Sequence, residues 1–139
     1  MQWDALRDRT DSKIAVPEDV AQVDRWGESW KMDLANIKDA TDWFEVLQTS
    51  KRTQTAMMIL SPGDETGRKA EAHEKSDQVL LILSGKLAGT VGPETVSLKK
   101  GDILLIRAGT PHRFENPGRQ RAVTFNVYSP PEYPPGMKG

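Results

Sequence analysis

The sequence predicts an all-β fold, a small antiparallel barrel of short strands. From Thr53 onward the apolar runs are short, and nearly every run ends at a turn that contains glycine or proline. Many short strands at close spacing with such turns are typical of β-sandwiches and β-barrels. The intervals between the runs leave no room for crossover helices, so a parallel sheet is not expected.

Strands are expected where apolar or alternating residues are flanked by turn sequences. The run 86–91 alternates, so that Leu87 and Val91 share one face. Phe114 and Phe125 are expected in the core or in the wall of a pocket. The expected strands cover residues 55–60, 78–83, 86–91, 96–98, 103–106 and 122–128.

The 139 residues have the length of a single domain. Residues 1–52 are expected to form an irregular amino-terminal arm that packs on the barrel or on a dimer partner. This arm contains all four tryptophans, and its segment 17–27 has the start and stop residues of a short helix. The barrel is expected over residues 53–128. The proline-rich tail, 129–139, cannot donate a regular ladder of hydrogen bonds, so it is expected to be extended on the surface.

The composition excludes several classes of function. The chain has no cysteine, which removes disulfides, thiolate zinc sites and cysteine nucleophiles. Its net charge is −1, from 19 basic and 20 acidic residues. The sequence shows no basic face or arm, so no nucleic-acid partner is expected. No apolar run approaches the roughly 20 residues of a membrane helix. The amino terminus lacks the profile of a signal peptide, and a cytoplasmic protein is therefore expected.

The chain has only two histidines, and each lies in a polar stretch beside a predicted strand. Residues 101–116 read GDILLIRAGTPHRFEN and are similar to the second motif of the cupin superfamily, G-x5-P-x-G-x2-H-x3-N. Every fixed position is matched except the proline, where Arg107 stands. Residues 71–85 read EAHEKSDQVLLILSG and resemble the first motif, in which a histidine pair is followed by a glutamate and, six residues later, by a glycine.

The resemblance implies a double-stranded β-helix (jelly-roll) barrel that holds one metal ion inside. Cupins supply two histidines and a glutamate from the first motif and one histidine from the second. His112 matches the histidine of the second motif, and Gln78 stands at the glutamate position. Two alignments remain for the histidine pair, Glu71 with His73 or His73 with Lys75.

We favour Glu71 with His73, because the spacing to Gln78 then matches the family and because a lysine ammonium would repel the cation. The implied metal ligands are therefore His73, His112, Gln78 and Glu71. Two imidazoles and a carboxylate with open positions suit iron, and manganese, nickel or zinc could also be held. The net charge of the ligands equals that of the family, since Glu71 adds the negative charge that Gln78 lacks.

Three functions follow from the resemblance. The first is a metal-dependent enzyme of the oxygenase, decarboxylase or isomerase type that acts on a small polar metabolite. The second is a non-catalytic, metal-free module that binds such a metabolite. The third is a structural or storage-like barrel with a vestigial site. Small cupin-like proteins commonly pair sheet to sheet, so a homodimer is expected.

Overall fold

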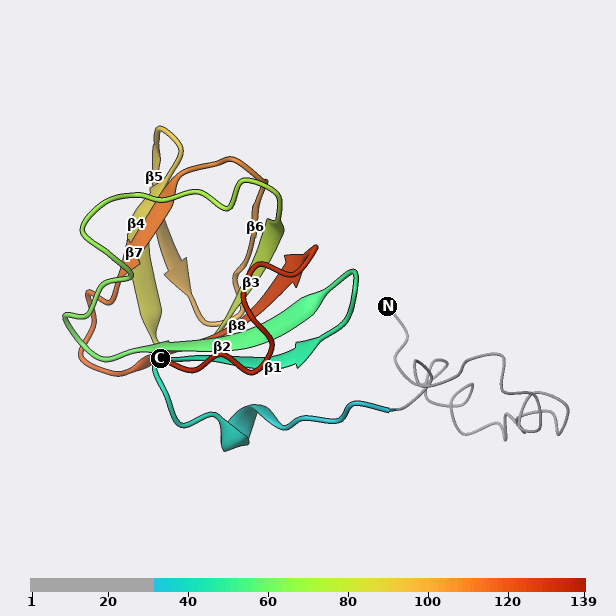
Figure 1. The fold of residues 1–139 in the computed structure, drawn as a ribbon. Helices are drawn as coiled ribbons and strands as arrows, with labels where there is room; N and C mark the ends of the chain where they lie inside the picture. The colour runs from blue at the N-terminus through green and yellow to red at the C-terminus, as the bar shows by residue number, and fades with distance from the viewer. Residues whose placement is uncertain (1–31) are drawn as a thin grey trace, which may run out of the picture. The chain divides into compact units, whose positions relative to one another are not determined.

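The computed structural model describes residues 32–139. Within this range one short 3-10 helix, η2 (Ile37–Asp39), precedes eight strands that alternate with loops (Figure 1). The strands are β1 (Phe44–Thr49), β2 (Gln54–Leu60), β3 (Asp77–Ser84), β4 (Lys86–Val91), β5 (Glu94–Lys99), β6 (Ile103–Ile106), β7 (His112–Glu115) and β8 (Ala122–Ser129).

The strands form two sheets, and every strand pairing is antiparallel. One sheet has five strands in the order β1-β2-β8-β3-β6, and the other has three in the order β5-β4-β7. Their apolar inner faces enclose one core (Figure 1). The all-β, double-stranded β-helix (jelly-roll) fold predicted from the sequence is confirmed.

Six of the strands lie where the sequence predicts them, and two do not follow from it. β1 was expected to be part of an irregular arm over residues 1–52, but it pairs with β2 in the five-stranded sheet. Its apolar run is interrupted by Glu45 and Gln48, which hides the strand in the sequence. β7 contains a single apolar residue, Phe114. The helix expected over 17–27 and the tryptophans other than Trp43 lie outside the described residues.

The carboxy-terminal tail is folded back on the barrel rather than simply extended on the surface. The Val46 amide donates to the Met137 carbonyl at 2.8 Å, and the Gly139 amide donates to the Phe44 carbonyl at 2.8 Å. Tyr133 packs against the hydrophobic core. The sequence did not predict this docking, in which the tail returns along β1 (Figure 1).

The inner face of β8 is more polar than its sequence suggests. The strand alternates strictly, and the buried positions include Thr124, Asn126 and Tyr128. Phe125, expected in the core or in a pocket wall, lies on the opposite, half-buried face. Hydrophobic alternation alone predicts that the face with Phe125 points inward. The prediction is wrong because Thr124 and Asn126, on the opposite face, form a buried hydrogen-bond network.

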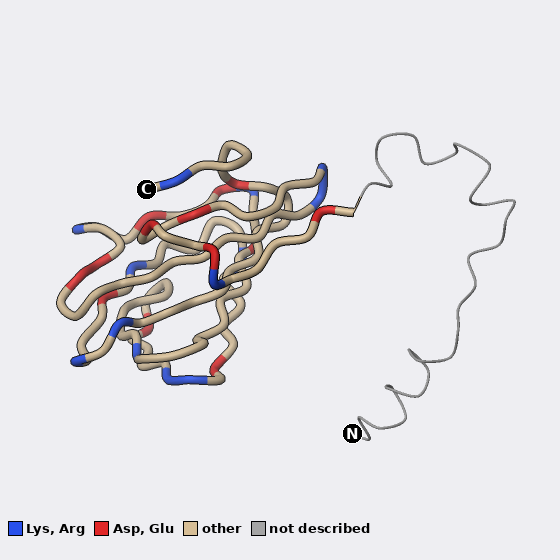
Figure 2. Tube along the Cα trace, turned by 90° about the horizontal axis from the view of Figure 1, so that it is seen from below, with Lys and Arg blue, Asp and Glu red and all other residues tan. Residues whose placement is uncertain are grey.

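Charges of both signs are interspersed along the described trace (Figure 2). The Lys99 amine lies 3.6 Å from the Asp102 carboxylate, in the turn between β5 and β6. Among residues 32–139, no helix has the length and apolar character needed to cross a membrane.

Candidate functional site

A cavity of about 110 Å³ lies inside the barrel, and the four predicted ligand residues all line it. Glu71 and His73 come from the loop between β2 and β3, Gln78 from β3, and His112 from β7. The rest of the wall is largely aromatic and consists of Trp43, Phe44, Phe114, Tyr128 and Tyr133, with Met58, Thr66 and Lys69. The predicted convergence of the two histidines is therefore present.

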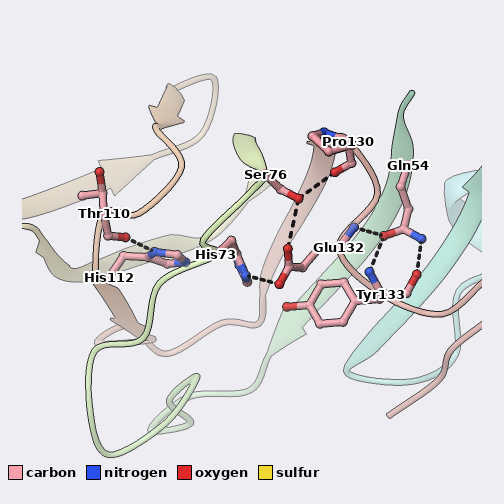
Figure 3. A network of polar contacts seen from close by, with 8 residues as sticks. All are labelled: Gln54, His73, Ser76, Thr110, His112, Pro130, Glu132 and Tyr133. Atoms are coloured by element: carbon pink, nitrogen blue, oxygen red, sulfur yellow. Dashed lines mark hydrogen bonds and ion pairs between the residues drawn. The ribbon is translucent and has the colours of Figure 1, made fainter. Parts of the chain in front are cut away.

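His112 is oriented by the main chain just before it. Its Nδ1 lies 2.9 Å from the Thr110 carbonyl oxygen, which can only accept, so Nδ1 carries the hydrogen and donates (Figure 3). Burial and the neighbouring His73 lower the pKa of His112, although the bond to Thr110 opposes this shift. The ring is thus neutral at neutral pH, with a lone pair on Nε2.

His73 faces His112 across the cavity. The centroids of the two rings are 5.0 Å apart. The His73 Nδ1 lies 3.2 Å from Oε1 of Glu132, a residue of the tail (Figure 3). Its ring also meets Tyr128 edge-on, with centroids 5.3 Å apart. Both imidazoles therefore direct Nδ1 to an oxygen acceptor and keep Nε2 for a guest.

The backbone places Glu71 beside His112. The amide of each of these residues donates to the carbonyl of the other, at 3.1 and 2.9 Å, so the loop extends the three-stranded sheet beyond β7. The Glu71 side chain is exposed at the rim of the cavity. Lys75 is exposed and does not line the cavity. This placement favours the alignment that pairs Glu71 with His73.

Gln78 presents a buried acceptor that has no partner. Its Nε2 donates to Asn126 Oδ1 at 3.0 Å, and Asn126 Nδ2 donates to Thr124 Oγ1 at 3.0 Å. The Thr124 hydroxyl donates in turn to the Met58 carbonyl at 2.9 Å. Because that carbonyl can only accept, the chain has one direction, and the remaining atom of the Gln78 amide is its oxygen.

That oxygen, Gln78 Oε1, is buried without a hydrogen-bond partner in the structure. A buried polar atom left without a partner costs on the order of 1–3 kcal/mol. A cation or a donor hydrogen placed against this atom, from a ligand or from water, would remove this cost.

The donors in the cavity fit a divalent metal ion only as a mixed set. Among residues 32–139, no group of three histidine, cysteine or acidic side chains is arranged to hold one. The Nε2 atoms of His73 and His112 and the unpartnered Gln78 oxygen nevertheless provide three candidate donors, and Glu71 provides a carboxyl group at the rim. Imidazole and oxygen ligands suit iron, manganese, nickel and zinc.

Two tyrosines complete the wall next to His73. The pKa of Tyr128 is raised well above its usual value, mainly by burial and further by contact with Tyr133. Burial also raises the pKa of Tyr133, as do the charges of Glu132 and Glu71, against the opposing hydrogen bond from Tyr128. Both are therefore neutral phenols. Because the Tyr128 hydroxyl donates to Tyr133, the Tyr133 hydroxyl is the one of the two that keeps its hydrogen for a guest.

Sequence reasoning did not find several residues of the site. Glu132 and Tyr133 come from the tail, whose prolines suggest an inert extension. Asn126 and Thr124 lie on the face of β8 that its apolar residues predict to be outside. The one signal in the tail sequence is that Glu132 and Tyr133, an acidic and an aromatic residue, lie among prolines.

Comparisons with known proteins agree with this architecture. An uncharacterized protein of Streptomyces coelicolor is 30% identical over 82 residues, which are 59% of this chain and 74% of that protein. A Bacillus halodurans crystal structure matches with a TM-score of 0.68 and 25% identity, over 73% of this chain and 80% of the other. A predicted oxalate decarboxylase from Thermotoga maritima matches with a TM-score of 0.53 and 27% identity, over 58% and 69% of the two chains.

The family comparison covers both motifs and the strands around them. The model of the cupin domain family matches residues 56–128, which is more than half of the chain. This range contains His73, Gln78 and His112 and excludes β1 and the tail that carries Glu132. The chain belongs to the cupin superfamily.

Proposed function

We propose that the cavity binds a divalent metal ion, Fe, Mn, Ni or Zn, and that the protein is a metal-dependent enzyme acting on a small polar metabolite. His73, His112 and Gln78 would hold the ion, with Glu71 at the rim. The observation that carries the proposal is the convergence of two imidazoles, 5.0 Å apart between centroids, in a cavity that is also lined by Gln78, whose buried Oε1 has no hydrogen-bond partner.

The bound ion would supply a Lewis acid or, as iron, a centre for oxygen chemistry. The chain's own residues define what can enter beside it. A cavity of about 110 Å³ favours a small guest. The ammonium of Lys69, an exposed residue of the wall, can bind an anionic group, and the Tyr133 hydroxyl can donate a hydrogen bond.

These features favour a small carboxylate as substrate. Cupins host many reactions, among them oxygenation, decarboxylation and isomerisation, and the fold alone does not choose among them. The likeness to a predicted oxalate decarboxylase supports decarboxylation as the first reaction to assay, with oxalate as the first probe. Its small dianion matches both the size of the cavity and the charge of Lys69.

Metal content tests the proposal directly. Protein purified without a nickel column should contain close to one metal ion per chain by elemental analysis. His73→Ala and His112→Ala should each lose the ion, while Lys75→Ala, an exposed change outside the cavity, should keep it. Glu71→Ala should lower the affinity. Stoichiometric metal that survives both histidine substitutions would refute the site.

A metal-free module that binds a small metabolite is the second candidate. It is favoured by the lack of three converging histidine or acidic side chains among residues 32–139. In that case a donor hydrogen of the metabolite would satisfy Gln78 Oε1. Wild-type protein that stays metal-free after incubation with each of the four ions, yet melts at a higher temperature with a small carboxylate, would select this function.

We further propose a homodimer formed through the outer face of the five-stranded sheet. Val79 pairs with Leu105 and Val127 across adjacent strands, and Leu81 pairs with Ile103 and Phe125. Ile103 is 69% exposed and Leu105 is 48% exposed. A contiguous apolar face of this kind is typical of an interface. Light scattering should give a dimer for the wild type and a monomer for the double variant Ile103→Lys, Leu105→Lys.

Cytoplasmic localisation stays a prediction.

A further inference from the structure

We propose that the carboxy-terminal segment is a working part of the site, in which Glu132 is a positioning residue that fixes the ring orientation and the tautomer of His73. The consequence for metal affinity rests on the proposed function, whereas the tautomer of His73 does not. The segment follows residues 56–128, the part of the chain that the cupin-domain model matches.

The contact between Glu132 and His73 lies behind the ring, away from the guest. The Glu132 Oε1 atom is 3.2 Å from the His73 Nδ1 atom, and Glu132 does not line the cavity. An ionised carboxylate can only accept, so it holds the hydrogen on Nδ1 and leaves the lone pair on Nε2. Carboxylates in this position orient metal-binding histidines and make them more basic.

The Glu132 carboxylate is itself held in place by a buried serine. The Ser76 hydroxyl lies 3.0 Å from Glu132 Oε2 and 2.7 Å from the Pro130 carbonyl, so its one hydrogen serves two acceptors of the tail (Figure 3). Ser76 is 1% exposed. The two oxygens of Glu132 therefore have different partners, which defines the orientation of its carboxylate.

Gln54 fixes the backbone of the same segment. Its Oε1 accepts from the amides of Glu132 and Tyr133 at 3.1 and 3.0 Å. Its Nε2 donates to the Tyr133 carbonyl at 2.8 Å and to Thr49 Oγ1 at 3.0 Å (Figure 3). The fully buried amide of Gln54 thus uses all four of its hydrogen-bonding positions, three of them on the tail. Such a complete set of bonds marks a docked element rather than a loose end.

Nitrogen-15 NMR of the imidazoles, together with zinc affinity, tests the inference. In metal-free wild type the His73 ring should carry its hydrogen on Nδ1. Glu132→Leu should shift the ring toward the Nε2–H tautomer and weaken zinc binding by about 10–100-fold. Glu132→Gln should keep much of the tautomer, because the amide oxygen still accepts. Glu74→Leu, a matched change at an exposed acid next to His73, should alter neither.

Ser76→Ala provides a second test if Glu132→Leu fails to fold, since it keeps the carboxylate and removes only its support. It should shift the tautomer and the zinc affinity in the same direction by a smaller factor. A wild-type tautomer and wild-type zinc affinity in folded Glu132→Leu, or in Ser76→Ala where Glu132→Leu does not fold, would overturn the inference. If wild-type protein binds no zinc, the proposed metal fails, and the metal-free tautomer still decides the role of Glu132.

Discussion

The two histidines of the cavity are oriented in different ways. His112 donates from Nδ1 to the Thr110 carbonyl, a main-chain atom two residues away in the same motif. His73 sends Nδ1 to the Glu132 carboxylate, a side chain of the distant tail. The first arrangement comes with the fold of a short loop, and the second depends on docking of the tail. Half of the site is therefore intrinsic to the barrel, and half is assembled on it.

The largest effect that separates the two halves is expected from Gln54→Leu. This substitution removes four hydrogen bonds and leaves the Glu132 and Tyr133 amides without their acceptor, which should cost about 3 kcal/mol in the free energy of unfolding. Urea denaturation measures the loss. Gln120→Leu, at an exposed glutamine, is the control. In the folded fraction the His73 tautomer should change and the His112 tautomer should not, and equal changes in both would remove the distinction.

A smaller effect is expected from the network behind Gln78. Asn126→Leu removes the acceptor of Gln78 Nε2 and should lower the free energy of unfolding by about 2 kcal/mol. The Gln78 amide would then be free to rotate, so zinc affinity should also fall. Thr124→Val keeps the shape of the side chain and should show a weaker form of both effects. Isothermal titration calorimetry measures the zinc affinity. Wild-type affinity in both variants would show that the network does not position Gln78 for the ion.

The smallest effect is expected from Thr110→Ala. The orienting atom for His112 is a backbone carbonyl, which any residue at this position supplies. The stability should change by no more than about 0.5 kcal/mol, and the His112 tautomer should be retained. A tautomer change in this variant, seen in the ring nitrogen spectrum, would show that His112 also depends on a side chain.

The same contrast explains how much of the molecule is predictable from its sequence. The strands with continuous apolar runs, such as β3, were predictable from local pattern. The convergence of His73, Gln78 and His112 on one cavity was predictable from the spacing of the two motifs. β1 was not, because Glu45 interrupts its apolar run. The groups that orient the two imidazoles could not be predicted either. A contact between residues as far apart in the sequence as Glu132 and His73 produces no periodic pattern.

The polarity of β8 follows from its role. Alternation assigns Thr124 and Asn126 to the outside of the sheet, but they lie inside, where their hydrogen bonds hold the amide of Gln78. Local pattern reports the average burial of a strand and not the hydrogen bonds of a site. The departures from simple patterning therefore cluster around the candidate site.

The most direct test is a zinc titration followed in the imidazole nitrogen spectrum, which contains only His73 and His112 because the chain has no other histidine. The Nε2 signals of both rings should shift together and saturate at one equivalent of zinc. A shift of only one ring, or independent shifts at different zinc concentrations, would contradict the claim that the two imidazoles share one guest.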